Sequence, residues 1–140
     1  MISYRVAKNG FDFDLDEVIG LYRESTLGER RPIEDRERWE KVLRNSNLVV
    51  TAWEGTLLVG ISRCITDFAY STYLADLAVR LTHQRKGIGK ELIRVSQREC
   101  NPAQIILLAA PKAVDYYPRI GMTPHHSCWT LKAGETLLDS

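Results

Sequence analysis

The stretch of sequence that most constrains the fold runs from Tyr73 to Cys100. It begins with a short apolar segment, Tyr73 to Val79, continues through a polar turn with two glycines, and ends in a helical pattern from Glu91 to Cys100. An order of strand, basic glycine turn and helix builds an anion site, because the first N–H groups of a helix have no intrahelical acceptor and the helix dipole favours negative charge there.

The turn combines glycines with basic side chains. Gly87 and Gly89 carry no side chain, so a bulky phosphate can approach the main chain closely. Arg85, Lys86 and Lys90 add positive charge around the same point. The pattern predicts a turn that binds a pyrophosphate. The alternative is an ordinary strand-to-helix turn capped by glycine.

The turn resembles the acyl-CoA signature of the GNAT family of N-acetyltransferases. Gln84, Gly87 and Gly89 match its (Gln/Arg)-x-x-Gly-x-(Gly/Ala) spacing, and Leu77 to Val79 resembles the strand end that precedes the signature. The resemblance implies acetyl-CoA as cosubstrate, with no metal, and implies that the strand end aligns the pantetheine and polarises the thioester carbonyl. The CoA-binding residues that it implies are Leu77, Ala78, Val79, Gln84, Arg85, Lys86, Gly87, Ile88, Gly89 and Lys90.

A second segment, Ala113 to Met122, resembles the A-x-x-F-Y-x-x-x-G-F segment of the same family. Tyr117 coincides with the tyrosine that in many members protonates the departing CoA thiolate. A phenol suits that role because it can supply a proton without carrying charge at neutral pH. Tyr116 replaces the common phenylalanine, so two neighbouring hydroxyls compete for the role. The alternative for Tyr117 is a helix tyrosine packed in the core.

The resemblance leaves the proton acceptor open. The family frequently has a glutamate on the central strand, eleven residues before the signature glutamine, and here that position is Tyr73. Because tyrosine is no base at neutral pH, we predict Asp76, the nearest acidic residue of the strand, as the acceptor. Strand alternation places Asp76 opposite Tyr73 unless a bulge lies between them. There are two alternatives to this prediction: Asp76 is a structural carboxylate, or the proton leaves through water with no dedicated base.

The rest of the chain alternates predicted strands and helices. Asp14 and Glu17 predict a capping box, and Glu54-Gly55 predicts a hairpin. The apolar run from Ile105 to Ala110 predicts a strand buried on both faces. The expected order is a strand over 2–7, a helix from 15 to near 26–28, a helix from Pro32, strands over 48–53, 56–65 and 73–79, the helix that follows the turn, a strand over 105–110, a short helix from Pro111 and strand-like material over 122–131.

This order predicts an α/β fold with a mixed central sheet. The hairpin implies antiparallel pairing early in the chain, the strand-helix alternation implies parallel pairing later, and helices cover both faces. It is also the order of elements in the GNAT fold. At 140 residues the chain is predicted to form a single domain over 1–140.

Composition excludes several classes. A net charge of +1 argues against a general nucleic-acid binder. Cys64, Cys100 and Cys128 lie far apart and predict neither a disulfide framework nor a zinc site, and His125 and His126 lack a third ligand at suitable spacing. No apolar run approaches the roughly 18 residues of a membrane span, and the first residues show no signal pattern, so we expect a cytoplasmic protein with no membrane partner.

The sequence therefore predicts an acetyl-CoA-dependent N-acetyltransferase that moves an acetyl group to a primary amine of a small molecule or peptide by direct transfer. A non-catalytic acyl-CoA-binding sensor or interaction module is the alternative. A P-loop hydrolase is a poor match because the turn lacks the Gly-Lys-(Ser/Thr) ending. Homodimerisation stays open. Candidate walls of the acceptor site, each with core packing as its alternative, are Tyr22, Trp39, Phe68, Tyr70 and Trp129.

Overall fold

The computed structural model describes residues 1–139, and the chain divides into two compact units, Met1–Leu108 and Ala109–Ser140. The first unit contains β1 (Ile2–Lys8), α1 (Leu15–Arg23), the 3-10 turn η1 (Gly28–Arg30), α2 (Arg36–Arg44), β2 (Leu48–Glu54), β3 (Leu57–Thr66), β4 (Ser71–Val79), the 3-10 turn η2 (Leu81–His83), α3 (Ile88–Cys100) and β5 (Gln104–Ile106). The second contains the 3-10 turn η3 (Pro111–Ala113) and α4 (Tyr116–Arg119). None of the helices within residues 1–139 is long and apolar enough to cross a bilayer.

The five strands form one sheet in the order β1-β2-β3-β4-β5. The first four strands pair antiparallel, and β5 pairs parallel with β4. The pairing of β5 is short, because its three residues contact only Ser71 to Tyr73 at the start of β4. The predicted mixed sheet is confirmed.

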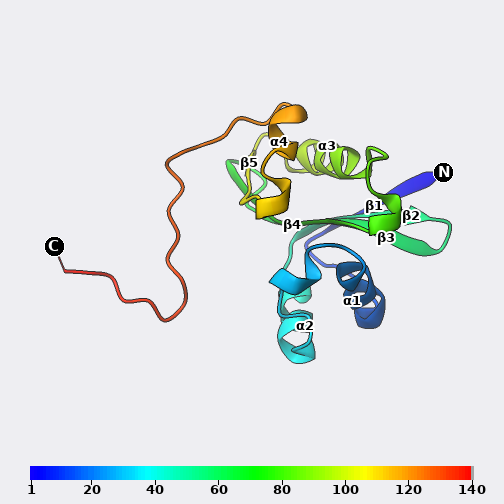
Figure 1. The fold of residues 1–140 in the computed structure, drawn as a ribbon, viewed down its shortest axis with the longest axis horizontal. Coiled ribbons are helices and arrows are strands. Elements are labelled where there is room, and N and C mark those ends of the chain that lie inside the picture. Colours follow the sequence, from blue (N-terminus) through cyan, green and yellow to red (C-terminus); the bar gives the residue numbers. More distant parts are fainter. Residues whose placement is uncertain (140) are drawn as a thin grey trace. The chain divides into compact units, whose positions relative to one another are not determined.

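Helices cover both faces of this sheet, as predicted. Side chains that alternate along the strands enter different cores: Val49 packs with α1 and α2, and Val50 packs with α3. Figure 1 shows α1 and α2 on one side of the sheet and α3 on the other. The sheet therefore separates a face covered by α1 and α2 from a face covered by α3.

The segment between α1 and α2 differs from the prediction. Asp14 caps α1 as expected, but α1 ends at Arg23 because Ser25 donates a hydrogen bond to the Tyr22 carbonyl and accepts one from the Leu27 amide, in competition with the helix. The second helix begins at Arg36 rather than at Pro32, because the Asp35 side chain provides its N-cap. Residues 24–35 thus form a structured connection.

One predicted strand is shorter and more exposed than expected, and another is wrong. The apolar run from Ile105 to Ala110 is not a strand buried on both faces: β5 ends at Ile106, whose side chain is 49% exposed, because β5 has β4 as its single neighbour in the described sheet. Within residues 122–139 no strand forms, and Trp129 is 90% exposed. Strand propensity is not sufficient without a pairing partner.

Candidate functional site

The predicted anion-binding turn lies between η2 and α3. Gly87 is the N-cap of α3 and has φ of 81°, a left-handed conformation that glycine adopts without strain. A Cβ atom at Gly87 would meet no atom within 4 Å. The glycine is therefore required by the backbone conformation, and the space above it is open to a ligand.

The start of α3 carries unpartnered backbone donors. No side chain caps this terminus, so the first-turn amides after Gly87 have neither an intrahelical acceptor nor a capping acceptor. Arg85, Lys86 and Lys90 are exposed around it, and no ion pair involves them within residues 1–139. The turn has the backbone donors and the positive charge that a phosphate group requires.

Gln84 connects this turn to β4. Its side-chain Nε2 donates a hydrogen bond of 3.0 Å to the carbonyl oxygen of Val79, the last residue of the strand. No local sequence pattern indicates this contact. It fixes the turn against the end of the strand.

The edge of β4 that faces β5 is open beyond Tyr73, because β5 pairs no further. The Arg80 amide donates to Val59 on the opposite side, in β3. The main-chain groups of successive strand residues point to alternate edges of the strand. Because the Arg80 amide points to β3, the main-chain groups of Leu77 and Val79 point to the open edge. Within residues 1–139, the Leu77 main chain therefore has no strand on its outer edge, near the end of β4 that leads to the predicted anion-binding turn.

Asp76 is the centre of a buried charge cluster. Its carboxylate accepts hydrogen bonds from the Tyr22 hydroxyl at 2.8 Å, from Arg31 Nε at 2.5 Å and from Arg63 Nε at 2.6 Å. Asp76 is 1% exposed. A carboxylate that accepts hydrogen bonds from three donors and has no solvent access is typical of a group that stabilises the fold. These contacts therefore favour a structural carboxylate, which is the alternative to a proton acceptor. The role of Asp76 as proton acceptor stays a prediction.

The titration behaviour of the partners keeps the cluster charged at neutral pH. Burial and the neighbouring Asp76 carboxylate raise the pKa of Tyr22 well above its ordinary value, so the phenol remains a donor. Burial alone would lower the pKa of Arg63, but the Asp76 charge and its hydrogen bond raise it overall. Asp76 thus lies beside the charged guanidinium of Arg63 and the neutral phenol of Tyr22, and the Arg31 guanidinium contacts its other oxygen.

A bulge in β4 decides which face Asp76 occupies. Arg63 pairs with Asp76, whereas the next residue, Cys64, pairs with Leu74, so Ala75 is an extra residue in β4. Leu74 packs with Cys64 near α3, whereas Asp76 contacts Tyr22 of α1. The bulge therefore places Asp76 and Tyr73 on the same face of the sheet. Without a bulge, strand alternation would have placed them on opposite faces.

Tyr117 lies in α4 of the second unit. Its ring meets that of Tyr116 edge to face, with centroids 5.3 Å apart. Burial and the neighbouring Tyr116 raise the pKa of Tyr117 above its ordinary value of 10.0, which keeps the phenol protonated at neutral pH. The role of Tyr117 as an acid stays a prediction.

The predicted acceptor walls separate into core and surface. Tyr22 and Trp39 are fully buried and pack edge to face with 5.0 Å between centroids, so they belong to the core. Phe68 packs against the cluster that contains Cys64 and Cys100, and Tyr70 and Trp129 are exposed. Tyr22 and Trp39 are therefore core residues and do not form walls of an acceptor site.

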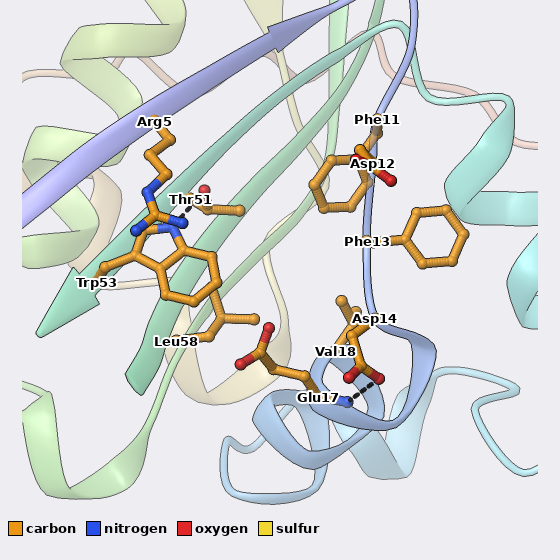
Figure 2. Close-up of a pocket in the computed structure, with 10 residues that line it drawn as sticks. All are labelled: Arg5, Phe11, Asp12, Phe13, Asp14, Glu17, Val18, Thr51, Trp53 and Leu58. Atoms are coloured by element: carbon orange, nitrogen blue, oxygen red, sulfur yellow. Dashed lines mark hydrogen bonds between the residues drawn. The ribbon is translucent and has the colours of Figure 1, made fainter. Parts of the chain in front are cut away.

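A cavity of about 310 Å³ lies at the N-terminal end of α1. No sequence pattern predicts this cavity. Figure 2 shows Trp53 on one side of it, the rings of Phe11 and Phe13 on the other, and Glu17 at the start of α1. The guanidinium of Arg5 covers the Trp53 ring at 4.1 Å. None of the predicted site residues lines this cavity, and within residues 1–139 no group of three potential ligands could hold a metal ion.

Comparisons with known proteins identify the family. Residues 24–132 match the family model described as acetyltransferase (GNAT) domain. An uncharacterised ycf52-like N-acetyltransferase of Prochlorococcus marinus is 32% identical over 101 residues, which cover 67% of this chain and 54% of that relative. The chain therefore spans about half the length of this curated relative.

Solved structures agree. A GNAT-family acetyltransferase from Streptococcus pneumoniae matches with a TM-score of 0.75 and 26% identity, over 94% of this chain and 96% of that chain. The aminoglycoside N-acetyltransferase AAC(6')-Iy, solved in complex with CoA, matches with a TM-score of 0.70 and 14% identity, over 94% of each chain, which shows a shared fold. By its family match over residues 24–132 and by its fold, this chain belongs to the GNAT family of acetyltransferases.

Proposed function

We propose that this protein transfers an acetyl group from acetyl-CoA to a primary amine of a small molecule or peptide. The observation that carries the proposal is the uncapped start of α3 beside the open edge of β4, in a chain of the GNAT family. The aminoglycoside acetyltransferase with the same fold was solved with CoA, which supports CoA as the ligand.

The residues of this chain divide the binding task between the turn and the strand. The amides between Arg85 and Lys90 hold the diphosphate, because a helix N-terminus favours an anion. Gln84 fixes the turn to the end of β4. The open main chain of Leu77 hydrogen-bonds the extended pantetheine chain and its thioester, as a strand edge pairs with an extended ligand.

Acetyl-CoA supplies an activated acyl group when bound. The substrate ammonium first loses one proton to solvent or to a base. In the transfer, a bond forms between the amine nitrogen and the acyl carbon while the carbon–sulfur bond breaks, and the nitrogen then releases a second proton to solvent. Tyr117 donates its phenolic proton to the departing sulfur and regains one from water afterwards. The pKa of Tyr117, raised by burial and by Tyr116, keeps that proton in place at neutral pH.

Binding is tested by calorimetry with acetyl-CoA and two matched variants. Gly87→Leu puts a side chain into the open space above the turn, and Gly55→Leu makes the same change in the β2–β3 hairpin, where φ is also positive and the space is also open. Gly87→Leu should weaken binding about tenfold or more, equivalent to at least one hydrogen-bonded phosphate contact. Gly55→Leu should change it less than about twofold. Equal effects of the two variants, or no heat with the wild type, would contradict the proposal.

Turnover separates an enzyme from a sensor. Thiol release from acetyl-CoA is measured across a panel of alkylamines, arylalkylamines and lysine-containing peptides. Amine-dependent thiol release supports acetyl transfer, whereas binding without release on any amine supports the non-catalytic acyl-CoA-binding module.

A further inference from the structure

One arginine outside the acyl-CoA signature holds the open edge of β4. The guanidinium of Arg31, from the α1–α2 connection, donates from Nε to Asp76 Oδ1 and from Nη2 to the Ala75 carbonyl oxygen at 2.9 Å. Nε and Nη2 form one side of the planar guanidinium, so a single fork holds two oxygens from successive residues. Ala75 is the extra residue of the β4 bulge. Arg31 therefore fixes the bulge itself.

The charge of Arg31 is not needed to neutralise Asp76. Arg63, whose side chain is 9% exposed, already forms a buried ion pair with that carboxylate. With Asp76 at −1 and two arginines at +1 each, the cluster carries a net charge of +1. The Arg31 side chain is 23% exposed, so it lies at the margin of the cluster. Its second bond, to the Ala75 carbonyl, needs an explanation other than charge balance.

That bond belongs to a pair of side-chain contacts that flank Leu77. Arg31 holds the Ala75 carbonyl on one side, and Gln84 holds the Val79 carbonyl on the other. Leu77 lies midway between them on the same open edge. The α1–α2 connection is also tied beyond the strand, where the Leu81 amide donates to the Glu24 carbonyl at 2.8 Å. Two residues of this connection, Glu24 and Arg31, thus bracket the segment of β4 that would face the acyl group.

We propose that Arg31 is a positioning residue for acyl transfer: it locks the β4 bulge so that the Leu77 main chain meets the thioester in one orientation. The inference rests on the proposed function. Arg31 acts through the backbone of β4 and contacts no reacting atom. Arg31 also connects residues 24–35 to β4, the strand that binds acetyl-CoA. The backbone geometry of β4 therefore depends on the conformation of residues 24–35.

The kinetic test compares three variants at Arg31 with one control. Arg31→Ala should lower kcat about tenfold or more while the acetyl-CoA Kd changes less than about twofold, because misplacement affects the reacting geometry more than the grip on the diphosphate. Arg31→Met, which keeps the unbranched stem of the side chain without the guanidinium, should behave similarly. Arg31→Lys should restore little, because an ammonium cannot hold both oxygens in fork geometry. Arg36→Ala is the control, since Arg36 forms an exposed ion pair with Asp16 away from β4.

Chemical rescue distinguishes positioning from general loss of structure. Guanidinium ion at millimolar concentration should restore part of kcat in Arg31→Ala, and ammonium should not. A folded Arg31→Met with kcat unchanged would overturn the proposal, as would equal losses in kcat and in acetyl-CoA affinity.

A second measurement does not depend on activity. Hydrogen exchange at Ala78 and Arg80, whose amides face β3, should accelerate in Arg31→Met and stay at the wild-type rate in Arg36→Ala. If no amine is acetylated but exchange accelerates, the proposed function fails while the structural link holds. If exchange is unchanged in both variants, the Arg31 proposal fails by itself.

Discussion

Asp76→Asn tests the buried cluster most directly. The substitution keeps the shape of the side chain but removes the negative charge, so the net charge of the cluster rises from +1 to +2. Arg63 is then a buried charge without a partner. Breaking a buried ion pair on one side destabilises a protein by about 3–5 kcal/mol. At about 2–4 °C per kcal/mol for a chain near this size, Tm should fall by roughly 6–20 °C.

The assay is urea unfolding followed by circular dichroism, with thermal unfolding beside it. Glu34→Gln is the control, because it breaks the exposed ion pair between Arg23 and Glu34 and should leave the unfolding midpoint near that of the wild type. The double variant Arg63→Met/Asp76→Asn should recover more than half of the loss, because it also removes the uncompensated buried charge.

The result that would refute this reasoning is a loss below about 1 kcal/mol in Asp76→Asn, which is the range of an exposed ion pair. Activity is measured separately, at a temperature where the variant is fully folded. A fall in kcat/KM of about tenfold or more under those conditions would support Asp76 as the proton acceptor, and a change under about threefold would remove it from the mechanism.

Three further predictions concern other parts of the chain. Tyr117→Phe should lower kcat by about a hundredfold and abolish a fall in rate at alkaline pH, because the raised pKa of Tyr117 means that its proton is lost only above pH 10.0; a rate within twofold of wild type would exclude it as the acid. In the native protein a thiol reagent should label the exposed Cys128 alone, because Cys100 is buried and burial raises the pKa of Cys64 to about 11; three labelled thiols without denaturant would contradict the packing. Gly60→Val should destabilise by about 1–3 kcal/mol in urea unfolding, because a Cβ there lies only 3.0 Å from a side chain of α3; an unchanged midpoint would show that α3 moves freely.

Sequence patterns predicted the elements whose signals are local. The apolar strand, the glycine turn and the amphipathic helix appear as β4, the start of α3 and α3 itself. Asp14 caps α1, and Gly55 lies in the β2–β3 hairpin. In each of these, a backbone conformation or a hydrophobic period is written into a few adjacent residues, so no knowledge of the tertiary structure is needed.

Where local signals compete or lack a partner, the sequence was misleading. The residues after Ile106 have the composition of a buried strand, but a strand forms only where another strand accepts its hydrogen bonds. Pro32 predicts the start of the second helix, but Asp35 supplies the stronger cap and α2 begins at Arg36.

The partners of Asp76 could be decided only by the tertiary structure. Arg31 lies 45 residues away in the sequence and Tyr22 lies 54 residues away, and neither has a pattern that marks it as a partner. Their meeting depends on the bulge at Ala75, because a shift of one residue in a strand moves its side chains to the other face. The sequence alone thus determined the kind of fold and the position of the glycine turn that is predicted to bind an anion. The register of β4 against β3, a long-range property, decided that the Asp76 carboxylate is buried and held by Tyr22, Arg31 and Arg63.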